Sequence, residues 1–267
     1  MTEIFTRIEP SRTADEVAQQ IESLILEGVL RTGDQLPGER ELARQFDVSR
    51  PILRDALKAL EARGLLVTRH GGGTFIADII GQVFSKPVIE LISSHPKAIA
   101  DYLEYRREIE GVAAEYAAQR ATADDLALLD AIMARMDEAH QANDFEAEAR
   151  VDVEFHHAVS ECAHNIILLH TLRSCYRLLS EDVFQNRLMI FTLPGAREAL
   201  LQQHHAIHAA IMAKDPEAAR KAAMDHIDYI EEASTRAQRV GDWRRIAKMR
   251  RQQRSDARDT DKTGPET

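Results

Sequence analysis

Apolar residues recur every three to four positions along residues 97–239 of this 267-residue chain, which is the spacing of one face of an α-helix. Breaks in the pattern divide the segment into six amphipathic helices, which we expect at residues 97–120, 123–142, 144–163, 165–187, 195–213 and 215–239. Thr122 and Asp125 form an approximate capping box at the start of the second helix. Because short connections join antiparallel neighbours, the pattern predicts an antiparallel all-α bundle.

Four polar residues interrupt the apolar stripes of these helices, and they are Asp152, His156, His204 and His226. Asp152 and His156 are one helical turn apart, so they share a face. A charge or an imidazole inside a core needs a compensating partner. A lone histidine on an apolar stripe is usually a satisfied core residue, but three such stripes favour a shared metal ion. Three imidazoles and one carboxylate suit Zn most, with Ni, Mn or Fe as alternatives.

Other histidines near this set have weaker cases. His208 lies one helical turn from His204 and on nearly the same face, so it remains a candidate for contacting the metal ligands without binding the metal itself. His157 and His205 project away from the stripes, and we expect both in solvent. Arg106 has a separate case, because apolar residues flank it in helical projection. A buried arginine needs an acid, so Arg106 either clamps a carboxylate effector or pairs with Glu110 one turn on.

The N-terminal part predicts three helices, at residues 12–28, 38–46 and 50–63, with a tight turn at Asp47-Val48 before the third. We expect Ser49 to cap the third helix, because serine oxygen accepts well from an exposed backbone N–H. Two β-rich runs then flank a glycine-rich turn, which indicates a hairpin. Helix, turn, helix and hairpin in this order predict a winged helix-turn-helix, a DNA-binding motif.

The third helix of this unit exposes Arg50, Arg54 and Lys58 on the face opposite its apolar stripe. Arginine there is able to pair with guanine in the major groove, although most charge runs are only a solvated face. His70 and Gly71 lie at the tip of the hairpin, where glycine permits a close approach to the DNA backbone or the minor groove.

Charge and composition bound the remaining possibilities. The net charge is −10, but residues 40–76 hold seven Lys/Arg against four Asp/Glu, whereas residues 79–240 hold sixteen against twenty-six. The acidic middle therefore says little about the DNA-binding surface. The chain has no run of 18 apolar residues and no apolar signal core, so we expect a cytoplasmic location. Cys162 and Cys175 are expected to be buried thiols.

These observations divide the chain into four parts: a winged helix-turn-helix at 11–77, a linker at 78–96, an all-helical metal- and effector-binding domain at 97–239, and a tail at 240–267. The tail contains WRRIAKMRRQQRS, which has six Lys/Arg and no acid. We expect it to be disordered, either as a solvated end or as an accessory phosphate contact.

The N-terminal stretch LPGERELARQFDVSRPILRDALKALEARGLL, followed by HGGGTF, closely resembles the DNA-binding domain of the GntR family of bacterial transcription factors. The resemblance implies roles at matching positions. Arg50 and Arg54 would read the major groove, and Arg40 would contact backbone or base near the groove edge. Ser49 would hold a phosphate, while His70 and Gly71 would reach the minor groove.

The helical part is similar to the ligand-sensing domain of the FadR-type subfamily, in its metal-containing branch. The matching pieces are YRREIEG, VDVEFHHAV, AHNIILL, QHHAI and AARKAAMDHI. The resemblance is greatest to regulators of pyruvate, lactate and glycolate metabolism. It implies Asp152, His156, His204 and His226 as the metal ligands. Effector binding is expected at Arg106 and Asn165.

Together these features predict a homodimeric transcriptional regulator, a repressor, that binds a pseudo-palindromic double-stranded operator. A small hydroxy- or keto-carboxylate at the metal site would control DNA binding. Two alternatives stay open. The metal could be purely structural with no acid effector, or the site could belong to a metal-dependent enzyme, although no general base accompanies it.

Overall fold

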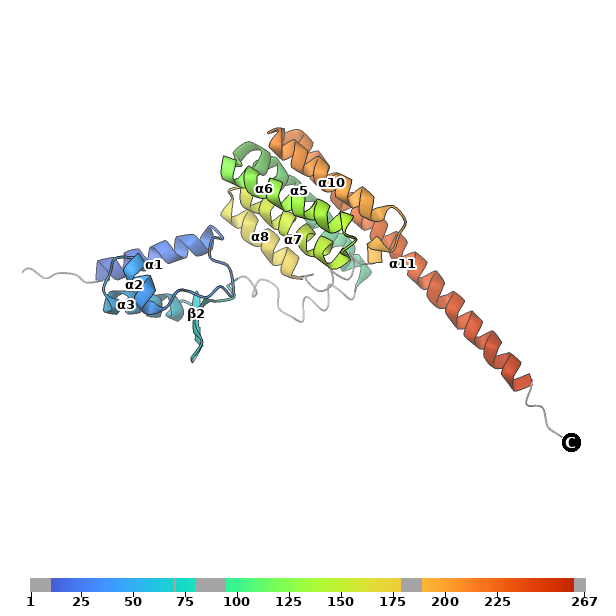
Figure 1. Ribbon diagram of the computed structural model, residues 1–267, viewed down its shortest axis with the longest axis horizontal. Coiled ribbons are helices and arrows are strands. Elements are labelled where there is room, and N and C mark those ends of the chain that lie inside the picture. Colours follow the sequence, from blue (N-terminus) through green and yellow to red (C-terminus); the bar gives the residue numbers. More distant parts are fainter. Residues whose placement is uncertain (1–10, 70, 80–94, 179–188, 262–267) are drawn as a thin grey trace, which may run out of the picture.

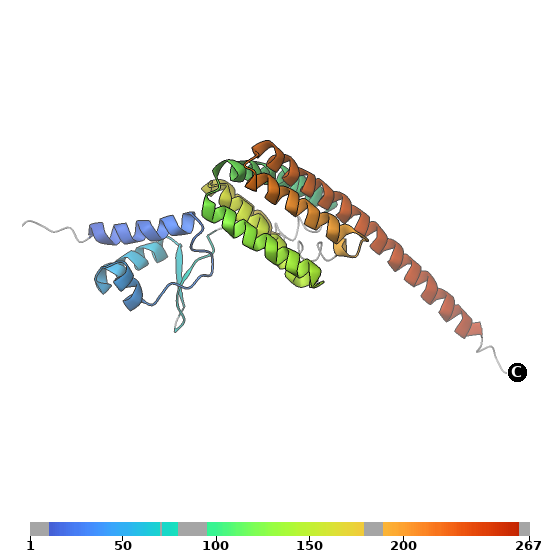
Figure 2. The ribbon, with the colours of Figure 1, turned by 45° about the horizontal axis from the view of Figure 1, so that its top comes forward.

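The computed structural model describes residues 11–69, 71–79, 95–178 and 189–261 (Figure 1). Most of the expected linker at 78–96 lies outside these residues. The described chain forms a small N-terminal unit and a larger bundle of helices, and the last helix projects from the bundle on the side away from the N-terminal unit (Figures 1 and 2). The fold is therefore mainly α with one small hairpin, as the sequence predicts.

The N-terminal unit contains three helices: α1 (Ser11–Leu26), α2 (Glu39–Gln45) and α3 (Arg50–Ala62). Their apolar faces meet in one core, in which α3 buries Leu53, Ala56 and Leu60. The turn between α2 and α3 places Asp47 at a left-handed φ of 53°, a conformation that aspartate tolerates better than most residues. The predicted helix-turn-helix is present.

Ser49 occupies the N-cap position of α3, but its side chain makes no capping hydrogen bond. The sequence-based expectation of a side-chain cap is therefore wrong. Pro51 lies in the first turn and has no N–H to be capped. The exposed Ser49 hydroxyl stands instead at the positive end of a 13-residue helix.

The wing is an antiparallel pair, β1 (Leu66–Arg69) and β2 (Gly73–Ile76), with Leu66 opposite Ile76 and Arg69 opposite Gly73. Gly73 has a φ of 97°, and a Cβ there would lie 2.7 Å from Gln35 Nε2, so this position requires glycine. Gly71, at the tip, is exposed and also left-handed. His70, expected at the same tip, lies outside the described residues.

The bundle is built from six described helices, and the capping box that joins Thr122 and Asp125 is confirmed. The helices are α5 (Pro96–Arg120), α6 (Ala123–Gln141), α7 (Phe145–Cys162), α8 (Ile166–Leu178), α10 (Ala196–Met212) and α11 (Pro216–Asp261). α5 packs along α7 and α11, and α10 packs against α6 and α11. Residues 179–187 of the fourth expected helix lie outside the described residues.

Helix α11 corrects one sequence-based expectation. It continues without a break through Asp261, so residues 240–261, which we expected to be disordered, are helical. The segment contains no proline, and six of its residues are arginine, which is a strong helix former. None of the described helices combines the length and the apolar character that a membrane span requires.

Candidate functional site

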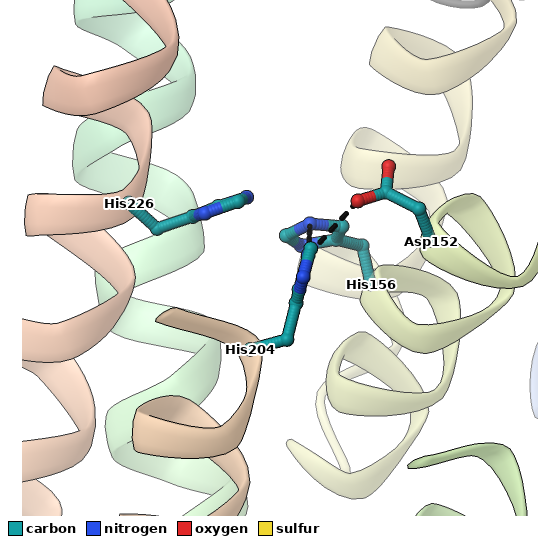
Figure 3. A group of neighbouring side chains, drawn as sticks. All are labelled: Asp152, His156, His204 and His226. Atoms are coloured by element: carbon teal, nitrogen blue, oxygen red, sulfur yellow. Dashed lines mark hydrogen bonds and ion pairs between the residues drawn. The ribbon is translucent and has the colours of Figure 1, made fainter. Parts of the chain in front are cut away.

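The four polar residues that interrupt the apolar stripes meet inside the bundle. Asp152 and His156 come from α7, His204 from α10 and His226 from α11, and their side chains point toward one another (Figure 3). Their exposed fractions are 5%, 6%, 2% and 0%, in that order. One potential ligand atom from each residue lies within 4.8 Å of all the others.

Two of the spacings within this set match those between ligands of one metal ion. His204 Nε2 lies 2.9 Å from Asp152 Oδ1 and 3.4 Å from His156 Nε2. Two nitrogen or oxygen ligands that bind one ion at about 2.0–2.1 Å are themselves about 3–3.4 Å apart at octahedral or tetrahedral angles. The donor set and its burial therefore fit a divalent transition metal such as Zn, although they do not single out one ion.

Two further side chains orient the histidine rings. Glu110 Oε2 on α5 lies 3.0 Å from His156 Nδ1, and Gln203 Oε1 lies 2.9 Å from His226 Nδ1. A carboxylate or amide oxygen can only accept, so each Nδ1 donates, and in the neutral ring that binds a metal the Nε2 then carries the lone pair. Outer partners of this kind fix the tautomer that a metal requires. Sequence reasoning assigned neither of them to the metal site.

Arg106 is buried as expected, with 4% of its surface exposed. Its Nε donates to Glu110 Oε1 at 2.6 Å, and its Nη2 donates to the Tyr176 hydroxyl at 3.3 Å. Burial opposes ionisation of Glu110, but Arg106 and His156 outweigh it and lower the pKa of Glu110 to about 2. Of the two alternatives left open for Arg106, the structure shows pairing with Glu110.

The other histidines that the structure describes lie outside the cluster. His157 was expected in solvent, which is wrong: its ring lies 5.0 Å from that of Tyr176, because α8 packs on that side of α7. Burial lowers the pKa of His157 to about 4, with a smaller contribution from Arg173. His208 Nε2 lies 2.8 Å from Asp130, and His205 is exposed as expected.

Asn165 stands at the start of α8, where its side-chain oxygen accepts a hydrogen bond from the backbone N–H of Leu168. It is thus an N-cap of that helix. Tyr176, the residue of α8 that contacts His156 and Arg106, is eleven residues further on, or about 16 Å along the helix axis. The structure therefore does not bring Asn165 into the cluster.

A small recess adjoins the cluster on the side of Asp152 and His204. Its lining is mostly apolar and comes from α6, α7, α10 and the turn before α10, namely Met136, Glu148, Asp152, Phe191, Leu200, Leu201 and His204. Two metal-type ligands, Asp152 and His204, thus stand at one end of a mostly apolar recess.

The expected DNA-reading surface is exposed on the N-terminal unit. Arg40, Arg50 and Arg54 are all exposed, but two of them already have a partner. Glu39 accepts from Arg54 Nε at 2.9 Å and from Arg50 Nη2 at 3.3 Å. Burial raises the pKa of Glu39, but the hydrogen bonds and charges of Arg54 and Arg50 together outweigh burial, and the net pKa is lowered. Glu39 thus holds both arginines side by side in the absence of DNA.

Helices α7 and α8 also connect the bundle to the N-terminal unit. Glu161, at the end of α7, accepts from Arg31 Nη2 at 2.8 Å and from Arg173 Nη2 at 2.6 Å. On α8, His170 Nε2 lies 2.8 Å from the Leu26 carbonyl oxygen. We call Glu161, Arg173, His170 and Arg31 the interdomain clasp. α7 carries Asp152 and His156 as well, so one helix bears both the clasp and half of the cluster.

Gly28 shows how close this interdomain contact is. Its φ of 72° is left-handed, and a Cβ there would lie 2.6 Å from the guanidinium of Arg173. Only glycine meets both conditions without strain.

Comparisons with known proteins agree with this architecture. Residues 13–76 match the family described as bacterial regulatory proteins, gntR family, and residues 101–229 match the FCD domain. The chain is 38% identical over 225 residues to the putative L-lactate dehydrogenase operon regulatory protein of Escherichia coli K12, which covers 83% of this chain and 86% of that protein. It is 32% identical over 218 residues to the Glc operon transcriptional activator of the same strain, covering 80% and 86%.

Among solved structures, Streptococcus agalactiae GntR is similar, with a TM-score of 0.53 and 29% identity over 82% of this chain and 99% of that chain. The matched domains and relatives are transcription regulators and not enzymes, which removes the enzymatic alternative considered from the sequence. The chain belongs to the GntR family of DNA-binding transcriptional regulators, with a winged helix-turn-helix followed by an FCD, or FadR-type C-terminal, domain.

Proposed function

We propose that this protein is a cytoplasmic, homodimeric repressor whose operator binding is controlled by a small hydroxy- or keto-carboxylate. The acid would bind at a divalent metal, Zn by preference, held by Asp152, His156, His204 and His226. The observation that carries the proposal is that four buried side chains of metal-ligand type, with one ligand atom of each within 4.8 Å of the others, meet inside a regulator of this family.

The chemistry of the acid follows from the donor set and from the relatives. A metal with three imidazoles and one carboxylate is able to accept further oxygen ligands, and a 2-hydroxy or 2-keto acid offers two adjacent oxygens. The relatives' names refer to an L-lactate dehydrogenase operon and to a Glc operon. Arg106 is already paired with Glu110, so we propose that it lies near the bound acid without contacting it directly. We do not propose Asn165 as an effector ligand, because it caps α8.

The interdomain clasp supplies a route from the site to the DNA-reading unit. An effector shifts an equilibrium only if it prefers one of the two states. A bound acid that rotates α7 by a fraction of a turn would displace Glu161 relative to Arg31. That displacement would change the preferred orientation of the winged helix-turn-helix. In a dimer, that changes the spacing of the two recognition helices, and with it the fit to a palindromic operator.

The test combines elemental analysis with thermal melting of the purified full-length protein. His226→Ala should lose most of the bound metal, whereas His205→Ala, which removes an exposed histidine on α10 beside His204, should keep it. L-lactate, glycolate or pyruvate at 100 times its Kd should add about 2.7 kcal/mol of stability, and a chelator should abolish that gain.

The outcomes separate the parts of the proposal. Bound metal with no response to any small acid would leave a purely structural ion and would overturn effector control. A wild-type protein that binds no divalent metal would overturn the metal centre itself. Full metal in His226→Ala would remove that residue from the site.

A further inference from the structure

The last part of α11 lies outside the family matches and outside the bundle. The FCD match ends at residue 229, whereas α11 continues to Asp261. We call residues 241–261 the C-terminal arm. At 1.5 Å per residue the arm is about 32 Å long, and it extends beyond the bundle at the end opposite the N-terminal unit (Figures 1 and 2).

Every arm residue from 241 to 253 is exposed. Residues 243–255 hold six Lys/Arg and no acid, whereas residues 79–240 hold sixteen Lys/Arg against twenty-six Asp/Glu. Within the described part of the chain, Arg245 pairs with Asp242 at 3.0 Å, and Arg244, Lys248 and Arg251 show no ion pair. These three follow one another at helical spacing and so form one continuous basic stripe.

The apolar side chains of the arm do not form a comparable stripe. Trp243, Ile246 and Met249 are 63%, 40% and 59% exposed. At 100° per residue they spread over about 120° of the helix, and Arg250 falls between the first two. A helix that pairs with another helix needs a narrow apolar seam, which this arrangement lacks. The arm is therefore better suited to a polyanion than to a protein groove.

We propose that the C-terminal arm is a second, sequence-independent contact for double-stranded DNA. Charge complementarity with phosphate carries the proposal, and membership in a DNA-binding family keeps the arm near DNA at high effective concentration. The arm and the winged helix-turn-helix lie at opposite ends of the molecule (Figures 1 and 2). The arm therefore contacts DNA outside the half-site that the winged helix-turn-helix of the same chain binds. This proposal is independent of the metal and of the effector.

The test measures binding to a mixed-sequence 60-bp duplex by fluorescence anisotropy between 50 and 200 mM NaCl. The probe needs no knowledge of the operator. The variant replaces Arg244, Lys248 and Arg251 by glutamine, which keeps helix propensity. If each cation neutralises one phosphate, the slope of log K against log salt should become shallower by about 2.7, at about 0.9 per contact. A chain that ends at residue 240 should show at least the same loss.

A matched control replaces Arg150, Lys221 and Arg236, three exposed cations of the bundle, by glutamine. It changes the net charge by the same amount and should leave the slope close to that of the wild type. Circular dichroism confirms that each variant keeps its helix content. An equal slope for the arm variant and the wild type overturns the proposal. Dissociation of the oligomer in sedimentation velocity, with no change of slope, also overturns it and assigns the arm to a second copy of this chain.

Discussion

Glu110→Gln tests whether the residues around the cluster are organised to hold a metal. Glu110 has two buried partners, because one carboxylate oxygen accepts from Arg106 Nε at 2.6 Å and the other lies 3.0 Å from His156 Nδ1. Glutamine keeps the shape of the side chain and one acceptor oxygen but removes the negative charge. The variant therefore weakens the hold on the His156 ring and leaves the Arg106 guanidinium without an anion.

The two consequences have different magnitudes. Loss of an outer partner of a ligating histidine lowers metal affinity by about 10- to 100-fold, or about 1.4–2.7 kcal/mol. Loss of one member of a buried ion pair destabilises the fold by about 3–5 kcal/mol, because both side chains are only 5–6% exposed. We therefore expect Glu110→Gln to lower both the metal affinity and the melting temperature of the metal-free protein.

The assay measures metal Kd by competition with a chromogenic chelator and measures melting temperature in the presence of excess chelator. Glu154→Gln is the matched control. Like Glu110→Gln, it removes one carboxylate charge. Glu154 lies on α7, two residues before His156, and its carboxylate forms an exposed ion pair with Arg135. An exposed pair contributes at most about 1 kcal/mol, so the control should keep both its metal and most of its stability.

A double variant separates the two roles of Glu110. Arg106→Gln combined with Glu110→Gln leaves no unpaired buried charge, so the melting temperature should recover in part while metal affinity stays weak. Recovery of wild-type metal affinity in the double variant would refute the reasoning, since Glu110 would then serve only to neutralise Arg106.

Three further predictions address the other parts of the molecule. Arg50→Ala should weaken binding to a duplex selected by the wild-type protein by about 1–3 kcal/mol, more than Arg44→Ala on α2 does in the same gel-shift assay. Glu161→Gln removes both ion pairs of the interdomain clasp, so amide exchange in the loop after α1 should accelerate while the metal content stays constant; unchanged exchange would contradict the clasp. Burial raises the pKa of Cys162 to about 12 and that of Cys175 to about 11, so at pH 8 both are protonated and should react with a thiol reagent only after unfolding.

The spacing of apolar residues predicted most of the architecture, because a helix with one buried face places an apolar residue every three to four positions. Leu53, Ala56 and Leu60 of α3, and Phe155 and Val159 of α7, recur at helical spacing on one face of their helix and are buried. The disorder expected for residues 240–261 was wrong for a related reason. The arm has good helix propensity but no apolar stripe, and the prediction relied on the stripe.

Outer contacts of the cluster were harder to predict. Glu110 carried a signal, since it is one turn from Arg106 in a segment with apolar flanks. Gln203 and Tyr176 carried none, because their roles depend on which helix lies opposite them. The misplacement of His157 has the same origin: its direction on α7 was correct, but α8 covers that side and not solvent.

The sequence by itself determined that Asp152, His156, His204 and His226 face an apolar interior, because local helix geometry sets the direction of each side chain. It also determined the order of helix, turn, helix and wing. Only the tertiary structure decided that α7, α10 and α11 bring those four side chains within 4.8 Å, that Arg106 pairs with Glu110, and that Glu161 reaches Arg31 across the two domains. The cluster and the Glu161–Arg31 contact join residues on different elements, and the relative placement of packed elements is a long-range property that no local pattern encodes. For Arg106 the sequence allowed two partners, and only the packing around it decided between them.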